Sequence, residues 1–154
     1  MKRAATVLLV AGVCAGVVGC AGVKEPDLRV VEARVAERTA EGVVMHFVVE
    51  GENTNEKELP LLQAEYRVSI DGREVFRATR SPEATLRRKG VQRFVLPAAV
   101  PAQELGSGAI RWSLSGSVGY IAPERLAETL LDMGLPNPTT SVRGSGEIEV
   151  GGAG

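Results

Sequence analysis

The sequence predicts an all-β fold, a two-sheet antiparallel β-sandwich of about seven strands with one added helix. Three observations support this prediction. Apolar and polar residues alternate with a period of two over most of the chain beyond residue 27, turn residues separate the alternating segments, and one segment has helical spacing instead. Segments that each bury one face must pack in two layers, which indicates a sandwich.

The segment 61–79 shows the strand pattern most clearly. Polar residues alternate there with apolar residues, and the Asp71-Gly72 pair follows. Both residues of that pair tolerate the positive φ of a hairpin turn, so residues 73–79 are expected to return as a second strand. The apolar positions of the first strand are Leu62, Ala64, Tyr66, Val68 and Ile70.

The remaining strands follow from the same alternation. The segment 43–49 is apolar almost throughout and is interrupted by His46, which predicts a central strand with one mixed face. Trp112 lies on an alternating segment and is expected to anchor the core. The other predicted strands span residues 28–37, 91–98, 110–120 and 142–150.

One segment, residues 123–133, departs from this pattern and predicts a helix. Its leucines recur at helical spacing, Pro123 suits the first helical position, and Gly134 is a typical stop. The helix is expected to cover an open end of the sandwich. An alternative is that its leucines gate an apolar cavity between the sheets.

The first 23 residues have the layout of an export signal. Two basic residues open the segment, an apolar body follows, and small residues precede a cysteine. This last part resembles the bacterial lipobox, in which a signal peptidase cuts before a cysteine that carries a diacylglycerol. We therefore predict a lipoprotein signal peptide over residues 1–19 and lipidation of Cys20. The lipobox residues are Val17, Val18 and Gly19.

Other fates of this leader stay open. Cys14 fits the lipobox poorly because Val13 precedes it, where that peptidase requires Gly, Ala or Ser. Residues 4–23 are uncharged and long enough to span a bilayer as an uncleaved helix. Against this alternative, several glycines weaken such a helix and no basic stop-transfer cluster follows. Cleavage at another position is the third alternative.

Cleavage before Cys20 would leave 135 residues without a second cysteine, so we expect no disulfide. Residues 20–27 would form the lipidated cysteine and a short tether with a reach of about 20–25 Å. The domain would span residues 28–150, close to the membrane, and residues 151–154 would form a Gly-rich tail. The formal net charge of −1 indicates no nucleic acid as a partner.

Residues 43–76 contain a more specific pattern, VVMHFVVEGENTNEKELPLLQAEYRVSIDGREVF. An apolar strand leads to Asn53 and Asn55, then to a Leu-Pro-Leu segment around Pro60 and a strand with Tyr66. A Gly-strand-Pro segment follows at residues 90–97. This order and spacing resemble the late embryogenesis abundant (LEA) type 2 family, also called the water stress and hypersensitive response (WHy) domain, over residues 28–150.

The resemblance implies an immunoglobulin-like or fibronectin-type-III-like β-sandwich with a helix. It also implies a role in desiccation or stress tolerance, and bacterial members of the family are often small envelope lipoproteins. The chain departs from the family pattern at Thr54, where proline is common between the two asparagines. The turn is therefore less constrained than in other members.

The motif residues also have simpler interpretations. Asn53 and Asn55 are expected to bind their own backbone in a turn, because asparagine amides do so readily. Four glutamates surround this turn and could bind Ca²⁺, but their spacing matches no EF-hand loop and favours a solvated acidic loop. The basic residues 87–89 could touch lipid head groups, although three charges are too few for stable attachment.

Neither catalytic nor metal-binding residues are expected. His46 is the only histidine, and no Gly-x-Ser-x-Gly segment supplies a nucleophile beside it. Zinc would require a second His or Cys ligand in the domain.

We therefore expect a non-catalytic, lipid-anchored envelope lipoprotein with no cofactor, bound to the membrane through its N-terminal acyl chains. Ala21 after the cysteine suggests the outer membrane, facing the periplasm, if the source is Gram-negative. A module that binds or transfers a lipid or another apolar ligand, and an accessory subunit that binds an envelope protein, remain alternatives.

Overall fold

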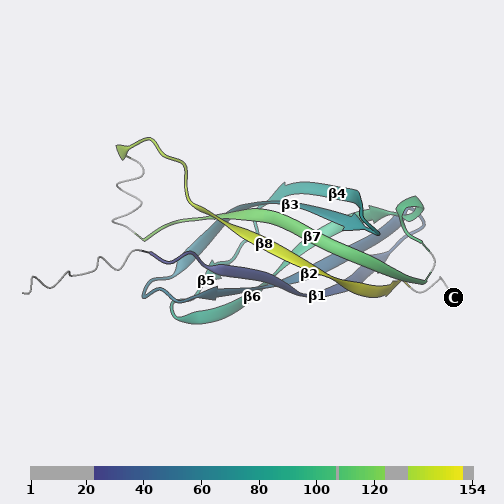
Figure 1. The fold of residues 1–154 in the computed structure, drawn as a ribbon, viewed down its shortest axis with the longest axis horizontal. Helices are drawn as coiled ribbons and strands as arrows, with labels where there is room; N and C mark the ends of the chain where they lie inside the picture. The colour runs from purple at the N-terminus through teal and green to yellow at the C-terminus, as the bar shows by residue number, and fades with distance from the viewer. Residues whose placement is uncertain (1–22, 107, 124–131, 151–154) are drawn as a thin grey trace, which may run out of the picture.

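The computed structural model describes residues 23–106, 108–123 and 132–150, and its strands run along one long axis (Figure 1). A short 3-10 turn, η1 (Ala102–Glu104), follows the sixth strand. The all-β prediction is confirmed. In chain order the strands are β1 (Asp27–Arg38), β2 (Gly42–Asn53), β3 (Leu59–Ile70), β4 (Arg73–Arg80), β5 (Thr85–Leu86), β6 (Gly90–Pro101), β7 (Gly108–Tyr120) and β8 (Thr139–Val150).

The strands form one curled, mixed sheet in the order β4-β3-β7-β8-β1-β2-β6, and β5 pairs with the beginning of β3. This differs from two separate antiparallel sheets, because β1 and β8 pair in parallel and join the two halves. The terminal strands β4 and β6 come close together, so the sheet curls into a half-barrel. There are eight strands rather than about seven, since β5 has only two residues and leaves no alternating pattern in the sequence.

Several predicted features lie outside the described residues. These are the signal peptide, the acylation site, almost all of the predicted helix at 123–133, and the Gly-rich tail. Within the part of the chain that the structure describes, no helix is long and apolar enough to cross a membrane.

The period-two alternation predicted the buried face of most strands correctly. Met45, Phe47 and Val49 of β2 are fully buried, and the inward positions of β7 and β8 follow the predicted series. The beginning of β3 differs from the prediction. A β-bulge between Leu61 and Ala64 changes the face, so Leu61 is buried and the predicted Leu62 is only half-buried.

Aromatic side chains hold the two halves of the sheet against each other. The Trp112 ring of β7 meets the Phe47 ring of β2 edge to face at a centroid distance of 5.2 Å, which confirms Trp112 as a core anchor. The Tyr66 hydroxyl of β3 donates a hydrogen bond across the interior to the Pro97 carbonyl of β6. Burial raises the pKa of Tyr66, so this hydroxyl remains a donor at neutral pH.

Inward-facing glycines allow the strands to approach closely. A Cβ atom built on Gly116 would lie 2.3 Å from the Glu65 carbonyl oxygen and 2.8 Å from the Tyr66 Cα atom. One built on Gly144 would lie 2.4 Å from the Cβ atom of Val30. Backbone atoms cannot move away as a flexible side chain can, so any side chain at Gly116 requires the strands to separate.

The close approach at Gly116 generates a stability prediction. Gly116→Ala should lower the free energy of unfolding by about 1–3 kcal/mol, the usual range for overpacking a filled interior. Gly119→Ala on the same strand is the matched control, because its nearest heavy atom would lie 3.4 Å away. Urea unfolding followed by circular dichroism measures both variants. Equal effects of the two substitutions would contradict the packing argument.

Candidate functional site

Asn53 ends β2 and is completely buried, at 0% exposure. Its Nδ2 group donates to the carbonyl oxygens of Lys57, at 2.8 Å, and Leu86, at 3.3 Å. Its Oδ1 atom accepts from the backbone N–H and the Nδ2 group of Asn55, both at 2.9 Å. The amide therefore uses both donors and both acceptor positions, as a buried polar group requires.

Asn55 continues this network to the beginning of the domain. Its Nδ2 group donates to the Lys24 carbonyl oxygen, and its Oδ1 atom accepts from the Lys24 N–H, each at 2.8 Å. The side chain thus binds both backbone polar groups of one residue, as a neighbouring strand would. The Asn55 carbonyl oxygen also accepts a hydrogen bond from the N–H of Lys89. We call Asn53 and Asn55 the asparagine cluster.

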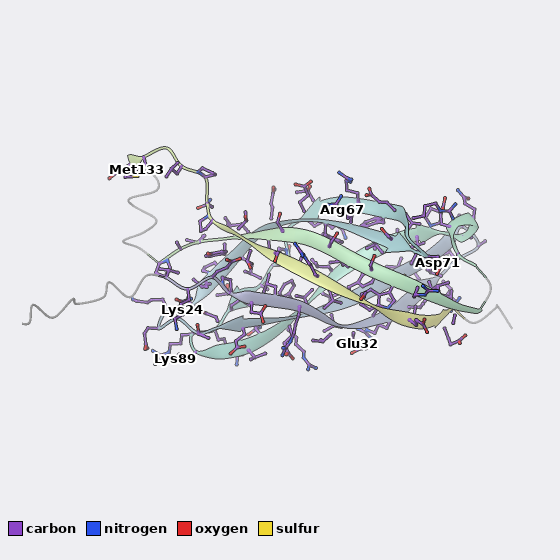
Figure 2. All side chains as sticks on the ribbon, in the orientation of Figure 1. Lys24, Glu32, Arg67, Asp71, Lys89 and Met133 are labelled. Carbon is purple, nitrogen blue, oxygen red and sulfur yellow. The ribbon has the colours of Figure 1, made fainter. Side chains whose placement is uncertain are left out.

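Another hydrogen bond holds the segment that precedes β1 at the same end of the domain. The buried Thr140 hydroxyl of β8 donates to the Pro26 carbonyl oxygen at 2.8 Å. Pro60 of β3 lies opposite Thr85 of β5, and its carbonyl oxygen accepts from the N–H of Ile121. Figure 2 places Lys24 and Lys89 together at one end of the long axis, opposite Asp71. The chain therefore enters the domain at this end.

Two of the four glutamates around the turn pair with basic side chains. Glu56 pairs with Lys89 at 2.5 Å, rather than with the adjacent Lys57. Glu50 lies in β2 and pairs with Arg29 and Arg93 instead of facing the turn. Within residues 23–106, 108–123 and 132–150, no three His, Cys, Asp or Glu side chains gather as a metal site requires.

His46 lies away from the asparagine cluster, half-buried in the middle of β2. Its neighbours at paired positions are Arg34 and Pro97. Carboxamides are neither acids nor bases at ordinary pH, so the asparagine cluster itself can hold a backbone in place but cannot transfer a proton. The asparagine cluster therefore holds the backbone of Lys24, which precedes β1.

The structure joins two of the predicted motif residues in the domain, Asn53 and Asn55, by hydrogen bonds, whereas Pro60 pairs with Thr85 of β5. The lipidation site Cys20 and the lipobox residues Val17, Val18 and Gly19 lie outside the described residues. Sequence reasoning predicted the turn around Asn53 but missed Lys24 and Leu86 as partners. Both contribute backbone groups, which every residue carries, so no sequence signal could have found them.

A family model described as late embryogenesis abundant protein, LEA type 2, matches residues 48–153, about two thirds of the chain. The chain belongs to the LEA type 2 family. The match contains the asparagine cluster and six complete strands, β3, β4, β5, β6, β7 and β8, while β1 precedes it. Among curated proteins, no sequence matches this chain.

Solved structures with similar folds agree with this membership. A protein described as late embryogenesis abundant, solved in solution, has a TM-score of 0.64 at 19% identity, covering 82% of this chain and 72% of its own. A protein from Arabidopsis thaliana gives 0.60 at 16% identity, covering 86% and 82%. A protein from Archaeoglobus fulgidus gives 0.53 at 7% identity, covering 80% and 95%. At these identities the likeness concerns the fold alone.

The network around Asn53 generates a second stability prediction. Asn53→Ala should lower the free energy of unfolding by about 2–3 kcal/mol, because it leaves the buried Leu86 carbonyl oxygen without its partner. Asn137→Ala is the control, since Asn137 is exposed and should change stability by about 0.5 kcal/mol at most. Urea unfolding measures both variants. A loss in Asn53→Ala no larger than in the control would contradict the role assigned to Asn53.

Proposed function

We propose that this LEA type 2 protein is a non-catalytic, lipid-anchored lipoprotein of the cell envelope. Acyl chains on Cys20 would hold it in the membrane, in the outer membrane facing the periplasm if the source is Gram-negative. The domain would contribute to envelope integrity or to tolerance of desiccation and water stress. The lipobox-like sequence before Cys20 and the family membership support this proposal.

The observation that carries the proposal is the binding of the Lys24 backbone by Asn55. Only three residues separate Cys20 from Lys24, so an extended chain allows about 14 Å between the anchor and the domain. This is shorter than the tether of residues 20–27 estimated from the sequence, because Lys24 already belongs to the folded part. An acylated Cys20 would therefore keep the asparagine cluster beside the lipid surface.

The free energy needed to remove acyl chains from the bilayer supports stable anchoring. Each buried CH₂ group contributes about 0.8 kcal/mol, so one acyl chain binds marginally while two or more hold the protein in the bilayer. A short tether then fixes which end of the domain faces the membrane. The end with Asp71 would point away from it (Figure 2).

The alternative of an apolar-ligand module receives less support. The interior of the described sheet is filled by its own side chains, among them Met45, Phe47 and Tyr66, each at most 1% exposed. An acyl chain would have to displace them. An accessory subunit that binds an envelope protein is compatible with the same anchored arrangement.

Acylation is tested directly by Cys20→Ser. The full chain, expressed in a bacterium with a lipoprotein pathway, should incorporate a clickable palmitate analogue and fractionate with the membrane. Cys20→Ser should lose the label, because serine offers no thiol for the diacylglycerol. Cys14→Ser is the matched control and should keep it. Unchanged labelling of Cys20→Ser would contradict the anchor.

The tether contact is tested by Asn55→Ala. This substitution removes both hydrogen bonds to Lys24, so the Lys24 amide should exchange with solvent about 2- to 10-fold faster. Amides of the core strand β7 should keep their rates, and Asn137→Ala should change neither set. Amide hydrogen exchange followed by NMR measures these rates. An unchanged rate at Lys24 would show that Asn55 does not hold the tether.

A further inference from the structure

Paired positions on seven strands align a row of charged side chains across the outer face of the sheet. Residues directly opposite each other on neighbouring strands point to the same side. Arg67 of β3 is paired with Arg77 on one side and with Ser115 on the other. From β4 to β6 the row consists of Arg77, Arg67, Ser115, Arg143, Arg29, Glu50 and Arg93.

In one half of this row a single carboxylate pairs with two guanidinium groups and offsets one of their two charges. The Glu50 side chain, 14% exposed, lies between Arg29 and Arg93 and contacts their Nη2 atoms at 2.6 and 2.9 Å. The hydrogen bond from Arg29, followed by that from Arg93, holds the pKa of Glu50 below its usual value. Glu50 therefore stays ionised, and its two arginines are occupied.

The other half carries positive charge that is only partly compensated. Arg77 pairs with Glu74 at 3.0 Å. Among the residues that the structure describes, Arg67 and Arg143 make no ion pair, and Arg143 lies opposite Arg29. Like charges at paired positions destabilise a sheet.

Arg67 and Arg143 line a groove of about 430 Å³ over β3, β7 and β8. The Nε group of Arg67 donates to the Ser115 hydroxyl at 3.2 Å, which holds its guanidinium near the residue midway between the two arginines. Figure 2 shows Arg67 on the outer surface, between the Lys24 end and the Asp71 end. The hydroxyls of Ser117 and Ser141 add further donors to the groove.

Carboxylates reduce the positive charge of the groove without cancelling it. Glu65 also lines it, and its charge adds to the raised pKa of Arg77, which is caused chiefly by the hydrogen bond with Glu74. Three guanidinium groups thus face two carboxylates. Glu74 acts mainly on Arg77 and more weakly on Arg67, and both Arg67 and Arg143 lie at exposed positions.

We propose that this groove binds a phosphate group, either free in solution or carried by a lipid head group. Guanidinium groups present planar pairs of N–H donors that match phosphate oxygens, and such charge-assisted hydrogen bonds are about twice as strong as neutral ones. Arg67 and Arg143 would bind the phosphate from two sides, and the hydroxyl of Ser115 would bind it from below. Arg77 would add to the local positive field.

The test uses the acylated full chain, isotopically labelled, in micelles of an uncharged maltoside detergent, which carries no phosphate. Titration with inorganic phosphate should shift the amide resonances of Arg67, Ser115 and Arg143 saturably, with a roughly millimolar Kd. In a second arm, phosphatidylglycerol added to these micelles without inorganic phosphate should produce the same shifts if the phosphate comes from a lipid head group.

Variants separate a specific groove from general charge attraction. Arg67→Gln and Arg143→Gln should each weaken binding about 10-fold, and both lie on exposed strand positions. Arg111→Gln is the matched control, because Arg111 lies on the same face of β7 outside the groove and pairs with Glu147. No saturable shift in either arm, or equal weakening by Arg111→Gln, would overturn the proposal.

Discussion

The parallel contact between β1 and β8 is the constraint on which the rest of the structure depends. Only two positions are paired there, Leu28 with Val142 and Arg29 with Arg143, yet they join the two halves of the sheet. The contact is close because Gly144 has no side chain and Val30 packs directly against its backbone. The buried hydrogen bond from Thr140 to the Pro26 carbonyl oxygen extends the contact toward the incoming chain. One short contact thus unites the sheet and directs the N-terminal segment to one end.

The asparagine cluster depends on the same arrangement. Asn53 must be buried to reach the Leu86 carbonyl oxygen of β5, and it can be buried only because its amide is fully hydrogen-bonded. Asn55 then lies where it can bind Lys24, directly before β1. The motif by which the sequence resembles the LEA type 2 family is therefore also the structure that attaches the incoming chain. Asn53 and Asn55 therefore connect one turn to the N-terminal segment of the domain.

The two proposals place different chemistry on different parts of the domain. The end with the asparagine cluster holds the chain that leads to Cys20, while the phosphate groove lies on the outer face of β3, β7 and β8. The asparagine cluster and the phosphate groove both depend on strand register more than on any single residue. Arg67 and Arg143 flank Ser115 only because β7 pairs with both neighbouring strands in this register. The described interior is filled chiefly by apolar side chains, and Asn53 and Thr140 are its buried polar residues.

The sequence by itself determined most of the residues that face the core, because strand alternation depends only on neighbours along the chain. It also determined the hairpin turn, where Asp71 and Gly72 have φ values of 49° and 85°, and the role of Trp112 in the core. The tertiary structure alone decided the bulge that buries Leu61, the parallel joining of β1 and β8, and the union of Asn55 with Lys24 across 31 residues. The tertiary structure alone also decided the row of arginines across the outer face of the sheet. Register between distant strands is set by how well their faces pack, and no local pattern contains that information.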